Sequence, residues 1–299
     1  MDRFHLMTVF VAVAEQESFA AGARKLGMSP PAVTRAIAAL EDRLGIQLLT
    51  RTTRYVRATD AGLRYLEHAR RIIAEADEAD EVAAGVHAAP RGQLAVTAPV
   101  LFGRMFVMPS MVEYLQRFPD MSISALFLDR VVNLLEEGMD VGIRIGELPD
   151  STMRAIGVCH VRRVVCASPT YLKAHGTPKS PAELARHTII AASPVSPNVD
   201  WKFAQGKKTL GVRLTPRLSV TSNDAAIVAA AQGFGVTRLL SYQIAPYLAS
   251  GQLKTVLGAY EPARLPIHIV HREGRQASAK VRTFVDLLVE KLQTDKALN

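Results

Sequence analysis

The chain has 299 residues, of which 48% are hydrophobic and 21% are charged, and its formal net charge is +8. This length and composition are ordinary for a soluble globular protein of about two or three domains. No apolar run approaches the length of about 18 residues that a transmembrane helix requires. The apolar stretch after Asp2 has no cleavage-like end, so we interpret it as a helix of the first domain and expect a cytoplasmic protein.

The positive charge does not by itself indicate nucleic-acid binding. Residues 1–59 carry 8 basic and 5 acidic groups, and residues 60–90 carry 3 basic and 7 acidic groups. Residues 91–299 carry 25 basic and 16 acidic groups, so most of the excess lies in the C-terminal two thirds of the chain. The local placement of basic side chains is therefore more informative than their total.

Residues 18–44 show the pattern of two short helices joined by a tight turn. Ser18 and Ser29 are predicted to cap the two helices with their side chains, and the turn is predicted at residues 26–28. The two prolines after Ser29 fit the first turn of a helix, because an N–H at that position has no helical carbonyl to bond. The residues at helical spacing that are predicted to face the core are Met28, Val33, Ile37 and Leu40.

The outer face of the second helix is predicted to contact DNA. A helix-turn-helix places the N-terminal half of its second helix in the major groove, where exposed side chains meet the base edges. An ordinary helical hairpin is the alternative interpretation. The predicted DNA contacts of this helix are Ser29, Pro30, Pro31, Thr34 and Arg35, with Ala32 on the same face.

The segment between Asp42 and Asp60 contains four arginines and no acidic residue. Strands are predicted at residues 47–49 and 54–57, with the tip of a hairpin at residues 50–53. A hairpin with arginines near its tip can lie along phosphates or enter a minor groove. Arg51 and Arg54 are therefore predicted DNA contacts, and the helices and the hairpin together predict an α-rich winged helix-turn-helix domain over residues 1–59.

These motifs resemble those of the LysR-type transcriptional regulators, and the resemblance continues to the C-terminus. The chain departs from the usual pattern at Gly22, at Leu49 and at Pro30, where the family frequently has glutamine. The resemblance implies a DNA-binding regulator with a linker helix and a small-molecule effector domain. The matching residues are Ser18-Phe19-Ala20, Ala23, Leu26, Ser29, Ala32-Val33-Thr34-Arg35, Ile37, Leu40-Glu41, Leu44-Gly45, Leu48, Arg51, Arg54, Thr59 and Ala61-Gly62.

A long helix is predicted over residues 60–90, capped by Thr59 and free of proline until Pro90. Its apolar stripe is narrow and is predicted to need a partner, although a solvated connector is the alternative. The resemblance implies that this linker helix pairs with the same helix of a second subunit, giving a homodimer or a homotetramer on a roughly palindromic DNA site. The stripe consists of Leu66, Ala69, Ile73, Ala76 and Ala83.

Residues 91–299 alternate between strand and helix patterns, which predicts βαβ units and largely parallel sheets. Crossovers near Arg163 and near residues 262–266 predict lobe I at about 91–162 and 267–299, and lobe II at about 163–266. The arrangement resembles the two-lobed, periplasmic-binding-protein-like α/β effector domain of the LysR family. Helices are predicted at 102–118, 131–137, 169–175 and 277–291, and also after the predicted caps Asn223 and Ser241.

Small molecules bind open α/β sheets at the carboxyl ends of strands, and two such lobes enclose a cleft. Arg144 and Arg238 are the most informative candidates, because an arginine within an apolar strand needs an anion or a carboxylate partner. Asp129 or Glu147 could simply neutralise either of them. The candidate effector contacts are Thr97, Pro99, Val100, Leu128, Asp129, Arg144, Gly146, Asn223 and Arg238.

Catalytic, metal and cofactor sites are not predicted. The sequence contains no H-E-x-x-H, G-x-S-x-G or phosphate-loop motif, and His268 and His271 would lie on opposite faces of a strand. Some members of the family sense peroxide with a cysteine pair. Cys159 and Cys166 lie in apolar strand patterns, however, and are predicted to behave as small buried hydrophobes.

We therefore predict an overall α/β protein that is a LysR-type DNA-binding transcriptional regulator and not an enzyme. Its predicted partners are double-stranded promoter DNA, a small and possibly anionic effector, and further copies of the chain, with no cofactor and no membrane. The alternative is a soluble two-lobed small-molecule receptor without a DNA role. Such a receptor would need an export signal and would have no use for residues 1–62.

Overall fold

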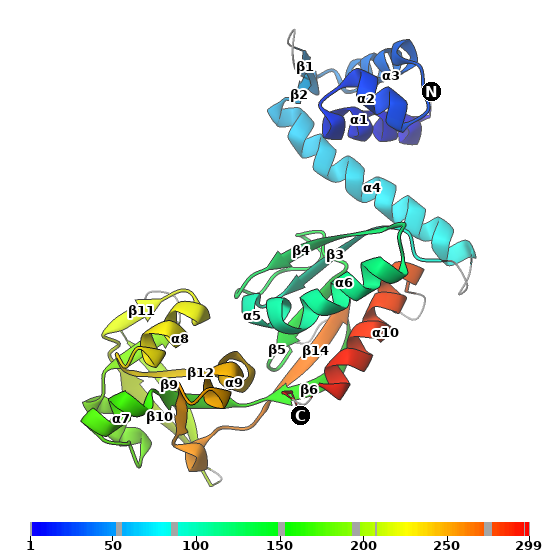
Figure 1. Ribbon diagram of the computed structural model, residues 1–299. Coiled ribbons are helices and arrows are strands. Elements are labelled where there is room, and N and C mark those ends of the chain that lie inside the picture. Colours follow the sequence, from blue (N-terminus) through cyan, green and yellow to red (C-terminus); the bar gives the residue numbers. More distant parts are fainter. Residues whose placement is uncertain are drawn as a thin grey trace. The chain divides into compact units, whose positions relative to one another are not determined.

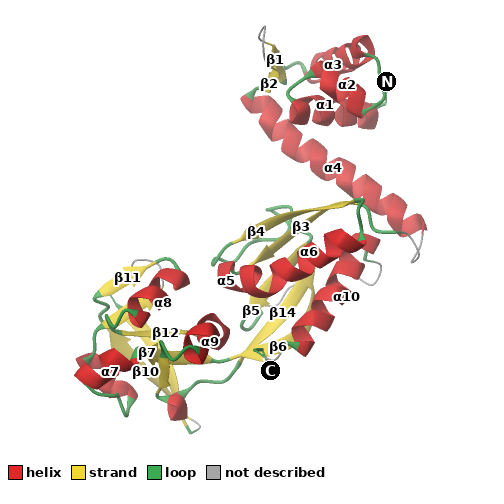
Figure 2. Cartoon of the chain, in the orientation of Figure 1, coloured by secondary structure: helices red, strands yellow, loops and turns green. Residues whose placement is uncertain are grey.

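The computed structural model describes residues 2–51, 56–84, 89–148, 153–192, 198–206, 208–271, 277–295 and 297–298. The chain forms two compact units, Met1–Ala88 and Ala89–Asn299. Figure 1 labels their elements and Figure 2 distinguishes helices from strands. Each unit is described separately.

The N-terminal unit consists of helices and one small hairpin around a single core. Phe10, Ile37, Leu40 and Leu48 are among its fully buried side chains. The elements are α1 (Arg3–Gln16), α2 (Phe19–Lys25), α3 (Pro30–Leu44), β1 (Leu49–Arg51), β2 (Val56–Ala58) and α4 (Asp60–Ala84).

The predicted helix-turn-helix is present, and one of its two predicted caps forms. The Ser18 side chain accepts a hydrogen bond from the Ala21 N–H, and Gly27 takes a left-handed conformation (φ 62°) in the turn before α3. Ser29 occupies the N-cap position of α3, but its side chain makes no capping bond, so that prediction is wrong. The reason is that Pro30 and Pro31 remove the first N–H groups, and the N–H of Ala32 bonds the Ser29 carbonyl at 3.0 Å.

The hairpin begins two residues later than predicted. β1 starts at Leu49 instead of residue 47 and includes Arg51, which pairs with Val56, so residues 50 and 51 belong to the strand and not to the tip. Leu48 and Leu49 are both buried, and both donate their N–H groups to Glu41 Oε1, at 2.7 and 3.0 Å. This carboxylate therefore fixes the start of the hairpin to α3.

The C-terminal unit contains two five-stranded sheets and a separate two-stranded hairpin. The sheet orders are β4-β3-β5-β14-β6 in lobe I and β11-β8-β12-β7-β13 in lobe II. The strands are β3 (Gly92–Ala98), β4 (Met121–Phe127), β5 (Val141–Ile145), β6 (Arg154–Val161), β7 (Arg163–Ala167), β8 (Ile189–Ala192), β9 (Val199–Gln205), β10 (Lys208–Leu214), β11 (Leu218–Val220), β12 (Val236–Leu240), β13 (Lys254–Val256) and β14 (Leu265–His271).

The sheets are mixed, which corrects the prediction of largely parallel sheets. In lobe I, β3 is parallel to β4 and β5, whereas β14 is antiparallel to both of its neighbours. In lobe II, β8 is parallel to β11 and β12, whereas β7 is antiparallel to both of its neighbours. The antiparallel strands adjoin the two crossovers, where the chain passes from one sheet to the other directly after β6 and through the short 3-10 turn Gly258–Tyr260 before β14.

Helices cover both sheets, and in Figure 1 α6 and α10 lie together over the sheet of lobe I. The predicted helix at 102–118 is interrupted by a π-helical turn, Gly103–Val107. The helical segments of this unit are α5 (Val100–Phe102), α6 (Met108–Arg117), α7 (Pro169–His175), α8 (Asn223–Ala231), α9 (Ser241–Ala249) and α10 (Ala279–Thr294), with 3-10 turns at Pro181–Arg186 and Gly258–Tyr260.

The predicted helix at residues 131–137 does not form. The segment is a turn in which Asn133 Oδ1 accepts from the Leu135 N–H at 3.1 Å, and Gly138 ends it in a left-handed conformation (φ 63°). A side chain that bonds the following backbone competes with helix formation in this way.

Two predicted helix caps in the C-terminal unit are also wrong. Ser222, and not Asn223, caps α8, because its side chain accepts from the Ala225 N–H at 3.4 Å. The Ser241 hydroxyl accepts from the Arg162 N–H at 3.2 Å, so it anchors the first crossover instead of capping α9.

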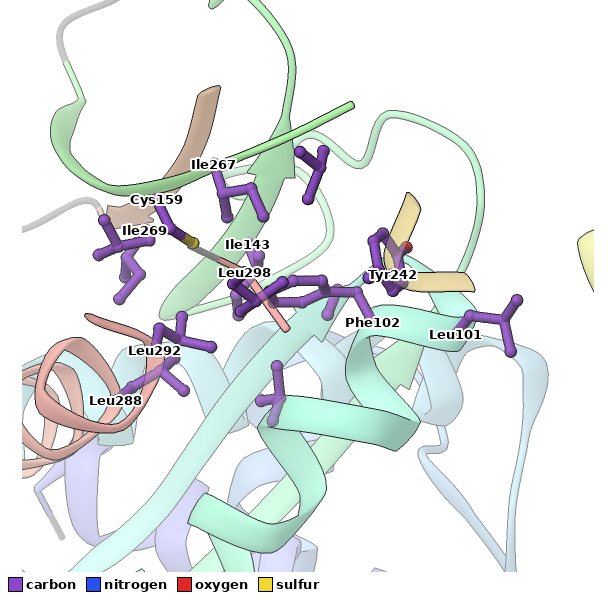
Figure 3. Packing of buried hydrophobic residues seen from close by; sticks show 14 of the residues in the cluster. Leu101, Phe102, Ile143, Cys159, Tyr242, Ile267, Ile269, Leu288, Leu292 and Leu298 are labelled. Atoms are coloured by element: carbon purple, nitrogen blue, oxygen red, sulfur yellow. The ribbon is translucent and has the colours of Figure 1, made fainter. Parts of the chain in front are cut away.

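The core of the C-terminal unit extends across both lobes. Phe102 of lobe I and Tyr242 of lobe II meet edge to face with ring centroids 5.3 Å apart. Figure 3 labels both side chains within the packed cluster. The two crossovers are also joined, because Arg162 Nη1 lies 3.1 Å from Glu261 Oε2. Arg162 stands between β6 and β7, and Glu261 precedes β14.

Candidate functional site

The first candidate site is the outer face of α3. Val33, Ala36, Ile37 and Leu40 are buried beneath this helix, which fixes the direction in which its remaining side chains point. On the opposite face at the N-terminal end, the exposed residues are Ser29, Pro30, Pro31 and Arg35, while Ala32 and Thr34 are partly exposed. All five predicted DNA contacts of the helix therefore lie on one continuous face.

The hairpin adds basic groups to the same unit. Arg57 is exposed on β2, and the backbone of Arg51 ends β1. Arg54, predicted to begin the second strand, and residues 52 and 53 of the predicted tip lie outside the described residues.

The linker helix α4 is shorter than the predicted range 60–90, because its described part ends at Ala84 and residues 89 and 90 are not helical. Only part of its predicted apolar stripe is available to a partner. Thr59 caps it as predicted, since its hydroxyl oxygen accepts from the Gly62 N–H at 3.0 Å. Leu66 and Ala69 are buried in the core of their own unit, which corrects the prediction that the whole stripe is too narrow to pack there. Ile73 and Ala76 are partly exposed, and the side chain of Ala83 lies outside the described part of the helix.

The second candidate site is a cavity of about 690 Å³ between the two lobes of the C-terminal unit. A volume of this size suits a small molecule. Six of the nine predicted effector contacts line it: Pro99, Leu128, Asp129, Arg144, Asn223 and Arg238. Residues that the sequence did not single out also line it, among them Arg163, Asp200, Trp201, Tyr242 and Gln243.

The other three predicted contacts lie elsewhere. Thr97 is fully buried, and its hydroxyl has no hydrogen-bond partner among the described residues. Gly146 does not line the cavity, and Val100 lines a smaller neighbouring one of about 220 Å³. The Val100 N–H donates to Asp129 Oδ1 at 3.0 Å, so a side chain of the protein already occupies this donor.

Arg238 lies against aromatic rings on the lobe II wall. Its guanidinium carbon is 5.1 Å from the centroid of Trp201 and 5.8 Å from that of Phe203, and its Nη1 donates to the Lys202 carbonyl at 3.0 Å. Burial, and then the neighbouring Arg163, lower the pKa of Arg238 to about 10. The group remains charged at neutral pH but is incompletely solvated.

The aromatic platform under Arg238 comes from the hairpin β9–β10, which the sequence interpretation missed. The signal was available, because Val199, Trp201 and Phe203 alternate with polar residues before the turn at Gly206. Leu210, Val212 and Leu214 alternate after it in the same way. This two-residue period is typical of a hairpin with one face buried.

Arg144 occupies the lobe I wall. It lies on β5, is half-buried, and donates through Nη2 to the carbonyl of Val132. Burial lowers the pKa of Arg144, although Glu137 acts in the opposite direction. Glu137 itself is paired with Arg130 through two hydrogen bonds of 2.7 and 2.6 Å.

Two polar contacts bridge the lobes near the cavity. Asn223 at the start of α8 donates to Asp129 Oδ2 at 3.0 Å, and Arg104 Nη2 lies 3.4 Å from Asp224 Oδ1. The same Asp129 carboxylate also accepts from lobe I backbone, so it joins the end of β4, the start of α5 and the start of α8. Because these contacts are exposed, each contributes only weakly to holding the two lobes together.

The two cysteines are buried and poorly suited to redox chemistry. Burial raises the pKa of the Cys159 thiol to about 11 and that of Cys166 to about 12, so both resist forming the reactive thiolate. Both cysteines are buried, as predicted. Within the described ranges, no group of three or more metal-ligating side chains is found. Every helix traced there is too short or too polar to span a bilayer.

Two sequence families match the chain. The family described as "Bacterial regulatory helix-turn-helix protein, lysR family" matches residues 4–63, and "LysR substrate binding domain" matches residues 87–293. The matched segments contain the helix-turn-helix and the two-lobed unit.

Proteins that align with nearly the whole chain are named transcriptional regulators. An HTH-type transcriptional regulator of Xanthomonas campestris pv. campestris (strain 8004) is 33% identical over 294 residues, which cover 96% of this chain and 85% of that protein. The HTH-type transcriptional regulator CrgA of Neisseria meningitidis serogroup B is 32% identical over 289 residues, 96% of each chain. The solved structure of CrgA from Neisseria meningitidis, described as a LysR-type transcriptional regulator, aligns with a TM-score of 0.61 at 32% identity, covering 96% of this chain and 98% of that one.

The fold alone is shared with a more distant structure. The full-length Vibrio cholerae virulence activator AphB is 24% identical and aligns with a TM-score of 0.63, covering 97% of this chain and 100% of that one.

Proposed function

The chain belongs to the LysR family of transcriptional regulators, and we propose that it reads promoter DNA with the outer face of α3 and with the wing, which is the hairpin formed by β1 and β2. In this proposal the inter-lobe cavity binds a small effector. Regulators of this family are not enzymes in general, and we extend this to the chain itself. The proposal also places the protein in the cytoplasm, where its DNA lies.

The observation that carries the proposal is the orientation of α3. Its apolar residues are buried on one side, and its predicted DNA contacts are exposed together on the other, at the N-terminal end that follows the Gly27 turn. A recognition helix needs this division, because its exposed side chains must reach base edges while the rest of the domain holds it rigid. In this proposal Arg35 and Thr34 read bases, whereas Arg51 and Arg54 contact phosphates or the minor groove.

For the C-terminal unit we propose a switch between open and closed clefts. A ligand that contacts both walls binds the closed cleft more tightly and shifts the population toward it. Such a change alters DNA binding only if it is coupled to the assembly of subunits. We propose that the partly exposed Ile73 and Ala76 of α4, with Ala83, form the seam of a dimer or of a pair within a tetramer.

The test is a gel shift with the DNA that flanks the chain's own gene. We expect a specific, salt-dependent complex on a roughly palindromic site, with at least about a thousandfold preference over random DNA of equal length. Equal affinity for both DNAs at all salt concentrations would contradict the proposal and would favour a receptor without a DNA role. A footprint of two half-sites would support the paired arrangement of recognition helices.

A further inference from the structure

Three arginines line the inter-lobe cavity without an acidic partner among the residues whose positions are described. Arg144 and Arg238 each donate to one backbone carbonyl, and neither they nor Arg163 form an ion pair with a described carboxylate. A guanidinium group has five N–H donors. One carbonyl bond therefore leaves most of the donors of Arg144 and Arg238 free for another acceptor.

The carboxylates at the cavity are already engaged. Asp129 accepts from the Val100 N–H and from Asn223 Nδ2, both at 3.0 Å. Asp200 lies directly opposite Arg213 in the register of β9 and β10, where opposite charges attract. The lining contains four arginines and two aspartates, and Glu137 pairs with one of the four, Arg130, so a net positive charge remains at the cavity.

Two of the arginines share one face of the lobe II sheet. Arg163 on β7 pairs with Leu240 of β12, and Arg238 pairs with Val165, so the two arginines are diagonal neighbours on antiparallel strands. Long side chains at such positions are within reach of each other. Trp201 and Phe203 support Arg238 from the hairpin, and burial lowers the pKa of both arginines. An anion between them would relieve a repulsion that water only partly screens.

The third arginine faces the cavity from the other lobe. Arg144 stands on β5 of lobe I, and its neighbour in the cavity lining, Ile143, is part of the buried core of that lobe. A ligand that reaches from the Arg163–Arg238 pair to Arg144 would therefore contact both walls. The positive groups on both sides require a negative group at each end of such a ligand.

On these grounds, and resting on the proposed regulatory function, we propose that the effector is a small molecule with two separated anionic groups, such as a short dicarboxylate. Arg163 and Arg238 bind one group and Arg144 binds the other. The ligand thereby adds an attraction between the lobes and favours the closed cleft. A compact dianion such as phosphate satisfies only one wall and does not have this effect.

The test is thermal shift and calorimetric titration of the full chain with succinate, glutarate and adipate at constant ionic strength. Butyrate, the diamide of succinate and inorganic phosphate are the matched probes. We expect at least one dicarboxylate to bind and to raise the melting temperature, because a ligand of the folded state stabilises it. The monocarboxylate and the diamide should bind at least about tenfold more weakly, the difference expected when charge-assisted hydrogen bonds are lost.

Substitutions assign the two ends of the ligand. Arg144→Gln and Arg238→Gln should each raise the Kd of the dicarboxylate by about tenfold or more. Arg217→Gln is the matched control, because Arg217 also lies over an aromatic ring, 5.5 Å from the Phe234 centroid, but does not line the cavity. It should change the Kd by less than about twofold.

Two results would overturn the proposal. One is that none of the three dicarboxylates binds although the chain gives its specific gel shift. The proposed regulatory function would then stand, but the proposed dianionic effector would be wrong. The other is that phosphate or butyrate binds as tightly as the dicarboxylate with no effect of Arg144→Gln, which would mean that a single anion site on one wall suffices. If the unmodified chain gives no specific gel shift at all, the result contradicts the proposed function and not only the proposed effector.

Discussion

In the N-terminal unit the residues proposed to read bases, Thr34 and Arg35, stand on one helix above one hydrophobic core. In the C-terminal unit the cavity is shared by two sheets, and polar contacts such as that between Asn223 and Asp129 bridge its walls. The first surface keeps its shape because it belongs to a single packed body. The shape of the second depends on how two lobes sit against each other, and the polar contacts that bridge them are exposed and individually weak, while Phe102 and Tyr242 pack between them. The comparison teaches that one unit presents a fixed pattern while the other responds to a ligand.

The largest effect is expected when the N-terminal unit loses its partner copy. Ile73→Asp places a charge at the proposed seam of α4, where desolvation is unfavourable. Loss of the second recognition helix should reduce operator affinity by about 10²- to 10⁴-fold, which is the usual gain from linking two binding modules. Analytical ultracentrifugation together with the gel shift measures assembly and binding in the same sample.

Leu63→Asp is the control for this change, because Leu63 lies on the same helix and is 57% exposed. It should leave assembly and operator affinity nearly unchanged. Native assembly and full affinity in Ile73→Asp would show that this part of α4 is not the seam.

A smaller loss is expected from the fixed surface itself. Arg35→Ala removes one base-edge contact and should weaken specific binding by about 1–3 kcal/mol. Random DNA should be affected much less, because phosphate contacts carry most non-specific affinity. Arg43→Ala, at the exposed far end of the same helix, is the control and should not alter the preference for the operator. An equal loss on both DNAs in Arg35→Ala would make Arg35 a phosphate contact.

A smaller effect still is expected when one polar contact between the two lobes is removed. Asn223→Ala removes the hydrogen bond to Asp129, which is worth about 0.5–1.5 kcal/mol, and should shift the cleft toward its open form. Amide hydrogen exchange at Val100, whose N–H bonds the same carboxylate, reports the change. Asp224→Asn weakens the contact with Arg104, which does not involve the carboxylate bonded by Val100, and should have a smaller effect on exchange at Val100. Unchanged exchange at Val100 in Asn223→Ala would mean that the hydrophobic contacts alone hold the lobes together.

The smallest effect concerns how α1 is attached to its neighbours. Burial raises the pKa of Glu15, but Lys25 of α2 and Arg70 of α4 outweigh it and hold that pKa below its ordinary value. Their nitrogens lie 2.9 and 3.0 Å from the carboxylate. A lowered pKa contributes stability that is fully present above the ordinary value and is lost as the pH falls through the lowered one.

Glu15→Gln should therefore destabilise the contacts of α1 with α2 and α4 by about 0.2–1 kcal/mol at neutral pH, since the side chains are largely exposed. The difference from the unmodified chain should vanish in acid, below the lowered pKa. Hydrogen exchange of α1 across the pH range measures it. A difference that persists at low pH would mean that packing, and not charge, is responsible.

The sequence predicted those elements whose signals are local. Ser18, the Gly27 turn and the paired prolines specify the helix-turn-helix within a few residues of each other. The same local logic failed at residues 131–137, where apolar spacing suggested a helix but the Asn133 side chain bonds the backbone instead. It failed again at Ser241, whose hydroxyl is used by Arg162, a residue 79 positions away.

The residues that line the cavity were also predictable only where the local sequence carries a signal. Arg144 and Arg238 stood out because each interrupts an apolar strand, and both line the cavity. Arg163 did not stand out, because it begins a strand and becomes informative only when β12 lies beside β7. Trp201 was missed because the hairpin that carries it belongs to neither predicted sheet. The alternation of Val199, Trp201 and Phe203 with polar residues was visible in the sequence, whereas Arg163 has no comparable local signal.

The salt bridge between Arg162 and Glu261 has a mechanical consequence. The two crossovers that connect the sheets are tied side by side, so they can bend together without separating the charges, whereas twisting one against the other would pull them apart. This ion pair therefore adds a small free-energy cost, of about 0–1 kcal/mol, to twisting that bending does not carry. Bending of the two crossovers together is the motion of the lobes that this contact opposes least.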